Sequence, residues 1–189
     1  MSRLYLIRHG KPAAVWGEAD EDPGLDETGK AQAEAARDYL MSLPEADRPR
    51  RVVSSPLRRC RETAMPTAEA LGVDLEIDAA VGEIPTPAGL DAAERPAWLR
   101  AVFQGKWKDV QGDLDYEVWR SDMVQSLEAR GGTAVFSHYV AINAVMSHLD
   151  SDERVLVFRP DHASISTLEV RTDGLALVER GREASTGVL

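Results

Sequence analysis

The amino-acid sequence predicts an α/β protein, a three-layer α/β/α sandwich in which helices cover both faces of a mostly parallel sheet. Short apolar runs typical of buried strands alternate with segments of helical character, at 3–7, 51–54, 73–77 and 133–136. Two later runs, 164–170 and 176–179, flank Thr172-Asp173-Gly174, a hairpin signal that predicts an antiparallel edge strand. The length of 189 residues suits one domain, 1–189.

The helices are predicted from their end signals. Asp26 is a suitable N-terminal cap for a helix that continues to Leu40, before Leu43-Pro44. A second helix is expected to open at Ser55-Pro56-Leu57 and to end near Gly72, with a bend at Pro66. Two further helices are expected at 116–129 and 140–149, and the segment 11–24 is expected to be a surface loop.

The segment from 84 to 112 has a weaker pattern, with several prolines and at best one helix, at about 92–103. We expect it to be a cap inserted into the domain. Because irregular insertions often carry specificity, the candidates for substrate recognition here are Trp98, Arg100, Lys106, Trp107 and Lys108.

Composition excludes several classes of function. The net charge of −10 disfavours binding to nucleic acid and to anionic membranes. The longest apolar stretch, 133–149, contains several polar residues and is short of the roughly 20 apolar residues of a membrane span. The single cysteine, Cys60, excludes an internal disulfide, and no export signal is visible, so we expect a cytoplasmic protein.

Two histidines are expected to meet at one rim of the sheet. His9 directly follows the run 3–7, and His138 closely follows the run 133–136. Ligands of parallel sheets bind beyond the carboxyl ends of the strands. Neutral imidazole is a good nucleophile toward phosphorus. Arg8 and Arg59 can offer forked hydrogen bonds to phosphate oxygens. Gly10 has no side chain, so the backbone there can approach a phosphate closely.

Each feature also has an ordinary structural interpretation. An isolated Arg-His-Gly sequence arises often by chance, His138 could be a structural histidine at a strand end, and the arginine-rich stretch 48–61 could be a solvated face. Arg58 and Arg59 point about 100° apart on a helix, so both cannot reach one phosphate. Cys60 lies on the apolar face of this helix and is expected in the core.

Taken together, the motifs resemble those of the histidine phosphatase superfamily, the phosphoglycerate-mutase-like enzymes. Four motifs occur in the family's order along nearly the whole chain: Leu6-Ile7-Arg8-His9-Gly10, the segment 25–33, the element 54–64 beginning Ser54-Ser55-Pro56, and Phe136-Ser137-His138. The resemblance implies a phosphoglycerate-mutase-like fold.

The resemblance also implies a catalytic set of His9, Glu83 and His138. In it, His9 is the phosphorylated nucleophile, Glu83 falls where the family keeps its proton donor, and Arg8, Arg59 and His138 bind the phosphate. Neither a metal nor another cofactor is implied. The expected partner is a small phosphorylated metabolite or phosphate, with no nucleic acid and no membrane, and the oligomeric state stays open.

Three positions depart from the family pattern. Lys11 follows the first motif where an acid is frequent, Tyr139 follows the second histidine where glycine is usual, and His162 replaces a frequent asparagine. None of these removes a catalytic group, and their roles stay open.

The sequence therefore predicts a metal-independent phosphatase that hydrolyses a small phosphomonoester through a phosphohistidine intermediate. Two alternatives remain: a phosphoglycerate mutase, which uses the same residues, and a non-catalytic module that senses a phosphorylated ligand.

Overall fold

The computed structural model describes residues 2–14, 22–91 and 93–185. Within them, one six-stranded sheet has the order β3-β2-β4-β1-β5-β6. The first four of these strands are parallel, whereas β5 is antiparallel to β1 and pairs with β6 in a hairpin. The strands are β1 (Ser2–Arg8), β2 (Arg51–Ser54), β3 (Leu75–Ile77), β4 (Thr133–Ser137), β5 (Ile165–Arg171) and β6 (Gly174–Glu179).

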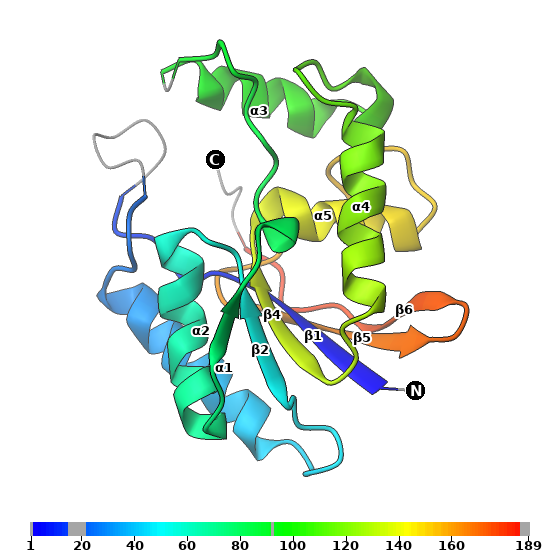
Figure 1. The fold of residues 1–189 in the computed structure, drawn as a ribbon. Coiled ribbons are helices and arrows are strands. Elements are labelled where there is room, and N and C mark those ends of the chain that lie inside the picture. Colours follow the sequence, from blue (N-terminus) through cyan, green and yellow to red (C-terminus); the bar gives the residue numbers. More distant parts are fainter. Residues whose placement is uncertain (1, 15–21, 92, 186–189) are drawn as a thin grey trace.

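Helices cover both faces of the sheet, as the sequence predicted. Figure 1 shows α1 (Glu27–Ser42) and α2 (Arg58–Leu71) on one face and α4 (Tyr116–Glu128) and α5 (Tyr139–Leu149) on the other. A further helix, α3 (Arg95–Gln104), stands apart from these layers, above the sheet in this view. The α/β/α sandwich with an antiparallel edge is thereby confirmed.

Both faces of β1 are buried, which explains why its sequence is apolar without alternation. Leu4 and Leu6 pack in the core under α4 and α5, while Tyr5 and Ile7 pack in the core under α1 and α2. Successive strand residues point to opposite faces, so a strand between two helix layers needs apolar side chains at every position.

The predicted helix ends are largely confirmed. Asp26 accepts a hydrogen bond from the backbone of Gly29 at 2.7 Å, and Gly72 ends α2 with φ of 66°. The predicted strand 73–77 is shorter in the structure, because the amide of Val73 bonds back to the carbonyl of Ala68 and completes the cap of α2. Pairing begins only at Leu75.

The segment 84–112 contains α3 and a short 3₁₀ turn, Trp107–Asp109. Pro96 lies in the first turn of α3, where its missing amide costs no helical bond. Ala92, where the predicted helix began, and residues 15–21 of the predicted loop lie outside the described residues. No helix among the described residues is long and apolar enough to cross a bilayer.

Candidate active site

The carboxyl ends of β1 and β4 bring the two predicted histidines together. These strands pair in parallel with Arg8 opposite Ser137, so His9 and His138 are the next residues on neighbouring strands. The amide of His9 donates to the carbonyl of Ser137 at 3.0 Å, and the two imidazole centroids are 5.3 Å apart. Both side chains are buried.

His9 has a defined tautomer. Its Nδ1 lies 2.8 Å from the carbonyl oxygen of Gly10. A carbonyl can only accept, so Nδ1 carries the hydrogen and the lone pair of the neutral ring is on Nε2. Burial, reinforced by the positive charges of Arg8 and Arg59, lowers the pKa of His9 well below its ordinary value. The ring is therefore neutral at pH 7, with Nε2 available as a nucleophile.

Arg59 and His138 form a hydrogen-bonded pair beside this ring. Nη2 of Arg59, the second residue of α2, lies 3.3 Å from Nδ1 of His138. Guanidinium nitrogens only donate, so Nδ1 of His138 accepts. Its Nε2 then carries the hydrogen of the neutral ring and donates to Oγ of Ser55 at 2.7 Å. Burial, followed by the charge of Arg59, lowers the pKa of His138.

Both ring nitrogens of His138 thus already have protein partners. A direct bond from His138 to a phosphate requires one of these partners to yield. Ser55 was not assigned a role from the sequence, although it lies in the motif that begins at Ser54. Its hydroxyl fixes the ring of His138 in the structure.

Arg8 is the most deeply buried cation of the site, with 5% of its surface exposed. Its Nη1 donates to the carbonyl of Pro160 at 2.9 Å, and its guanidinium lies over the ring of Tyr139. Burial lowers the pKa of Arg8 to about 10, while the charges of Glu83 and Asp161 act in the opposite direction. Arg8 therefore stays a cation at neutral pH.

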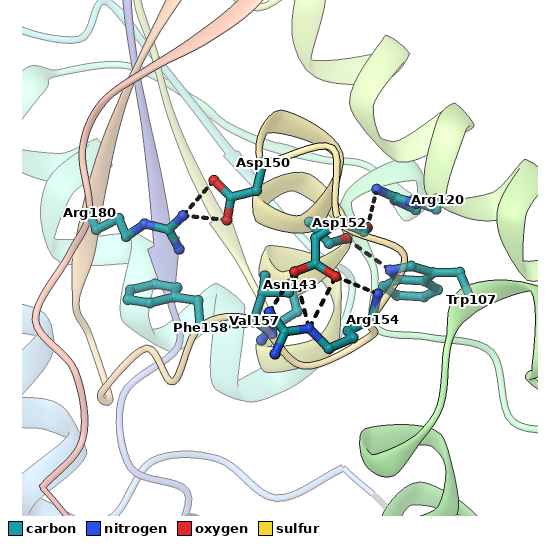
Figure 2. Close-up of polar contacts among 10 residues, drawn as sticks. Trp107, Arg120, Asn143, Asp150, Asp152, Arg154, Val157, Phe158 and Arg180 are labelled. Carbon is teal, nitrogen blue, oxygen red and sulfur yellow. Dashed lines mark hydrogen bonds and ion pairs between the residues drawn. The ribbon is translucent and has the colours of Figure 1, made fainter.

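The loop that supplies this carbonyl is tied to α5 by Asn143. The Asn143 side-chain oxygen accepts from the amides of Val157 and Phe158 at 3.0 and 2.9 Å, and its Nδ2 donates to the carbonyl of Tyr139 at 3.0 Å. Figure 2 shows Asn143 with Val157 and Phe158, beside the ion pairs that Asp150 and Asp152 form.

Glu83 lies at the N-terminus of α5. Its carboxylate accepts from the amides of Ile84 at 2.9 Å, Ala141 at 3.2 Å and Val140 at 3.5 Å. Burial raises the pKa of Glu83, although the hydrogen bonds and the nearby cations Arg59 and Arg95 oppose the rise. Burial therefore raises the pKa of Glu83 without any contribution from a bound phosphate.

Gly10 allows a close approach, but to α1. A Cβ on Gly10 would lie 2.7 Å from the carbonyl oxygen of Gly29, which no real contact permits. The amide of Gly10 also donates to Oγ1 of Thr63 on α2 at 2.9 Å. Gly10 thus lets the loop after His9 pack between α1 and α2. The sequence had led us to expect a close approach to the phosphate instead.

The three departures from the family pattern all lie near the site. Lys11 pairs with Asp26 at 2.9 Å. His162 lies beside His9, with ring centroids 5.9 Å apart, and burial lowers its pKa to about 4. Tyr139 packs against Arg8.

The specificity candidates of segment 84–112 divide clearly. Trp107 is only 1% exposed and donates to Oγ of Ser147, so it is a core residue. Lys106 pairs with Glu153, and Arg100 and Lys108 are exposed. Arg95 was not singled out, yet its charge opposes the rise that burial causes in the pKa of Glu83 and adds to the fall that burial causes in the pKa of His138. Arg95 stands alone between Glu94 and Pro96, so no motif in the sequence indicated that it would lie near the site.

The site is thus a cluster of neutral histidines and buried arginines at the carboxyl edge of the parallel strands, a class of site suited to an anion. No group of three or more His, Cys, Asp or Glu side chains that could hold a metal ion occurs in the part of the chain that the structure describes.

The chain belongs to the histidine phosphatase superfamily, branch 1, whose family model matches residues 4–182. The transcription factor tau 55 kDa subunit of Saccharomyces cerevisiae is 30% identical over 143 residues, which are 63% of this chain and 32% of that protein. The chain spans a third or less of the length of the curated relatives it matches.

Solved structures share the fold across nearly all of the chain. A mycobacterial glucosyl-3-phosphoglycerate phosphatase is similar with a TM-score of 0.71 at 22% identity, covering 97% of this chain and 99% of its own. A phosphoserine phosphatase from Entamoeba histolytica, solved in complex with 3-phosphoglyceric acid, has a TM-score of 0.74 at 20% identity, covering 96% and 98%.

Proposed function

We propose that this protein is a metal-independent phosphatase that hydrolyses a small phosphomonoester through a phosphohistidine formed at His9. The single observation that carries this proposal is the tautomer of His9, a buried neutral ring with its lone pair on Nε2. The cations Arg8 and Arg59 beside it support binding of a dianionic phosphoryl group.

In the first step, Nε2 of His9 forms a bond to phosphorus while the ester P–O bond breaks. The departing oxygen takes a proton from Glu83, whose raised pKa supports this acid role. In the second step, a water oxygen bonds to phosphorus as the N–P bond breaks, and the Glu83 carboxylate takes the proton of that water. Arg8 and Arg59 bind the phosphoryl oxygens in both steps, and His138 joins them when its Nε2–H turns from Ser55 to the phosphate.

The proposed substrate is a small phosphorylated metabolite. The structural relatives named above act on glucosyl-3-phosphoglycerate or phosphoserine, both of which carry a carboxylate beyond the phosphate. Arg95, whose charge acts on Glu83 and His138, is our candidate for contacting such a second anionic group.

We further propose that residues 1–189 form one domain, with 84–112 as the cap that carries Arg95.

The reaction is proposed to take place in the cytoplasm. The single cysteine, Cys60, is buried in the core and unpaired. A chain without disulfides suits a reducing compartment, and the net charge of −10 supports a partner other than nucleic acid or an anionic membrane.

The proposal is tested by incubating the protein separately with 4-nitrophenyl phosphate, phosphoserine and the phosphoglycerates. We expect release of inorganic phosphate. Efficient interconversion of phosphoglycerates with negligible phosphate release would identify a mutase. Tight phosphate binding without turnover of any of these compounds would identify a sensing module.

A further inference from the structure

Tyr139 lies between the phosphate-binding arginine and the segment 84–112. It is the first residue of α5 and is 9% exposed. The guanidinium carbon of Arg8 lies 4.9 Å from the centre of its ring. Phe103 of α3 meets the same ring, with centroids 5.6 Å apart and an interplanar angle of 66°. The three side chains form a continuous column from α3 to Arg8.

Arg8 requires such a partner because it is a buried cation. Removing a guanidinium from water is costly unless other groups stabilise its charge. Its Nη1 has the carbonyl of Pro160, whereas its buried Nε has no hydrogen-bond partner among the described residues. The negative face of an aromatic ring attracts a cation without occupying its N–H groups.

A carboxylate in place of this ring would stabilise Arg8 more strongly, but it would compete with the ligand. It would occupy the forked N–H groups and repel an incoming phosphate. The ring of Tyr139 therefore leaves the cation charged and leaves N–H groups for an anion.

We propose that Tyr139 is a positioning residue that keeps Arg8 charged and oriented for the phosphoryl group, and that Phe103 fixes the ring of Tyr139, so that α3 supports phosphate binding. This inference rests on the proposed function, in which Arg8 binds the phosphoryl group. Tyr139 stands where the resemblance leads one to expect glycine, so this column belongs to this chain's own residues.

The test compares Tyr139→Phe, which keeps the ring face, with Tyr139→Leu, which keeps an apolar side chain without the ring. Binding of inorganic phosphate to the whole protein is measured by calorimetry, and kcat and KM are measured with 4-nitrophenyl phosphate. The matched control is Tyr39→Leu on the exposed side of α1. Circular dichroism and thermal melting establish that each variant is folded.

We expect Tyr139→Phe and Tyr39→Leu to bind phosphate within about twofold of the wild type, and Tyr139→Leu to bind it about tenfold more weakly. KM should rise by a similar factor in Tyr139→Leu, while kcat changes by less than about threefold. The support that the ring gives to Arg8 is present both in the bound substrate complex and in the transition state, so its loss weakens both equally. Phe103→Leu should weaken phosphate binding in the same direction by a few-fold.

A folded Tyr139→Leu protein with wild-type phosphate affinity overturns the inference, as does equal weakening in Tyr139→Phe, which would assign the effect to the hydroxyl. A wild-type protein that binds phosphate but turns over no ester contradicts the proposed function alone, and the comparison of the Tyr139 variants still decides this inference. A wild-type protein that binds no phosphate contradicts both.

Discussion

A backbone carbonyl determines the chemistry available to His9. Because the oxygen of Gly10 takes the hydrogen of Nδ1, the lone pair is on Nε2. A second histidine, His138, is held in the opposite tautomer by Arg59 and Ser55. The two neighbouring imidazoles are therefore not equivalent, and this difference supports His9 as the proposed nucleophile.

Glu83→Gln is predicted to separate substrates by their leaving groups. The amide cannot supply a proton, so hydrolysis of an alkyl phosphate should slow by about 10²-fold. Hydrolysis of 4-nitrophenyl phosphate, whose leaving group needs little protonation, should slow by less than about tenfold. The measurement is kcat/KM on both esters, which reports the transfer step and excludes the later hydrolysis in which Glu83 is the proposed base. Glu69→Gln on the exposed surface of α2 is the matched control. Equal slowing of the two esters would assign the acid role to another residue.

At the residue scale, sequence reasoning identified the groups that lie directly after strands. The position of Arg8, His9 and His138 at one rim could be predicted because strand ends share that rim, whereas Arg59 was assigned to the phosphate by the family resemblance. The partners that determine tautomers and charges could not be predicted. Ser55 and Tyr139 act through contacts, and Arg95 through its charge, between elements far apart in the chain, and only the folded structure brings these groups together.

At the scale of elements, the loop between α5 and β5 has a particular importance, because its Pro160 carbonyl binds Arg8. The same loop supplies the carbonyl of Ser164 to the amide of Arg8, and the amide of Ala163 to the carbonyl of His9. Asn143 ties the start of this loop to α5 (Figure 2). The geometry of the site thus depends on a side chain outside the cluster of histidines and arginines.

Asn143→Ala is predicted to lower the free energy of unfolding by about 2–4 kcal/mol, because it leaves the amides of Val157 and Phe158 without their partner. Urea denaturation at neutral pH measures this change. Asp150→Ala, at the start of the same loop, removes the partly exposed ion pair with Arg180, which follows β6. This variant is the control and should cost less than about 1 kcal/mol. Similar losses in the two variants would contradict the assigned role of Asn143.

Element types and caps could be predicted where local chemistry determines them. Asp26 begins α1 and Gly72 ends α2 through bonds within the neighbouring residues. The start of β3 could not be predicted in this way. The amide of Val73 could bond either within the cap of α2 or to a neighbouring strand, and in the structure it belongs to the cap. The role of Gly10 depends on its distance from Gly29, which no local pattern encodes.

For the whole molecule, the buried histidines predict a loss of stability in acid. The pKa of His162 is about 4 in the folded protein against an ordinary 6.5, because burial disfavours its charged form. The unfolded chain therefore binds more protons between these values. The stabilisation is fully present above pH 6.5 and is lost as the pH falls toward 4, and the lowered pKa values of His9 and His138 act in the same direction.

His162→Asn should remove the part of this dependence that belongs to residue 162. Allowing for its partial solvent exposure, we expect the difference in unfolding free energy between pH 7 and pH 4.5 to shrink by on the order of 1–2 kcal/mol. Urea denaturation of both proteins at the two pH values provides the measurement, and His148→Asn at an exposed position is the control. An unchanged pH dependence would show that His162 titrates normally.

A covalent phosphohistidine at residue 9 can be detected by rapid chemical quenching during turnover of a phosphate ester, followed by mass spectrometry of the proteolysed chain. We expect an acid-labile phosphoryl group on the peptide that contains His9. In a folded His9→Ala variant this group should be absent, and turnover should fall by orders of magnitude. A phosphoryl group on another residue, or full turnover by His9→Ala, would contradict the proposal.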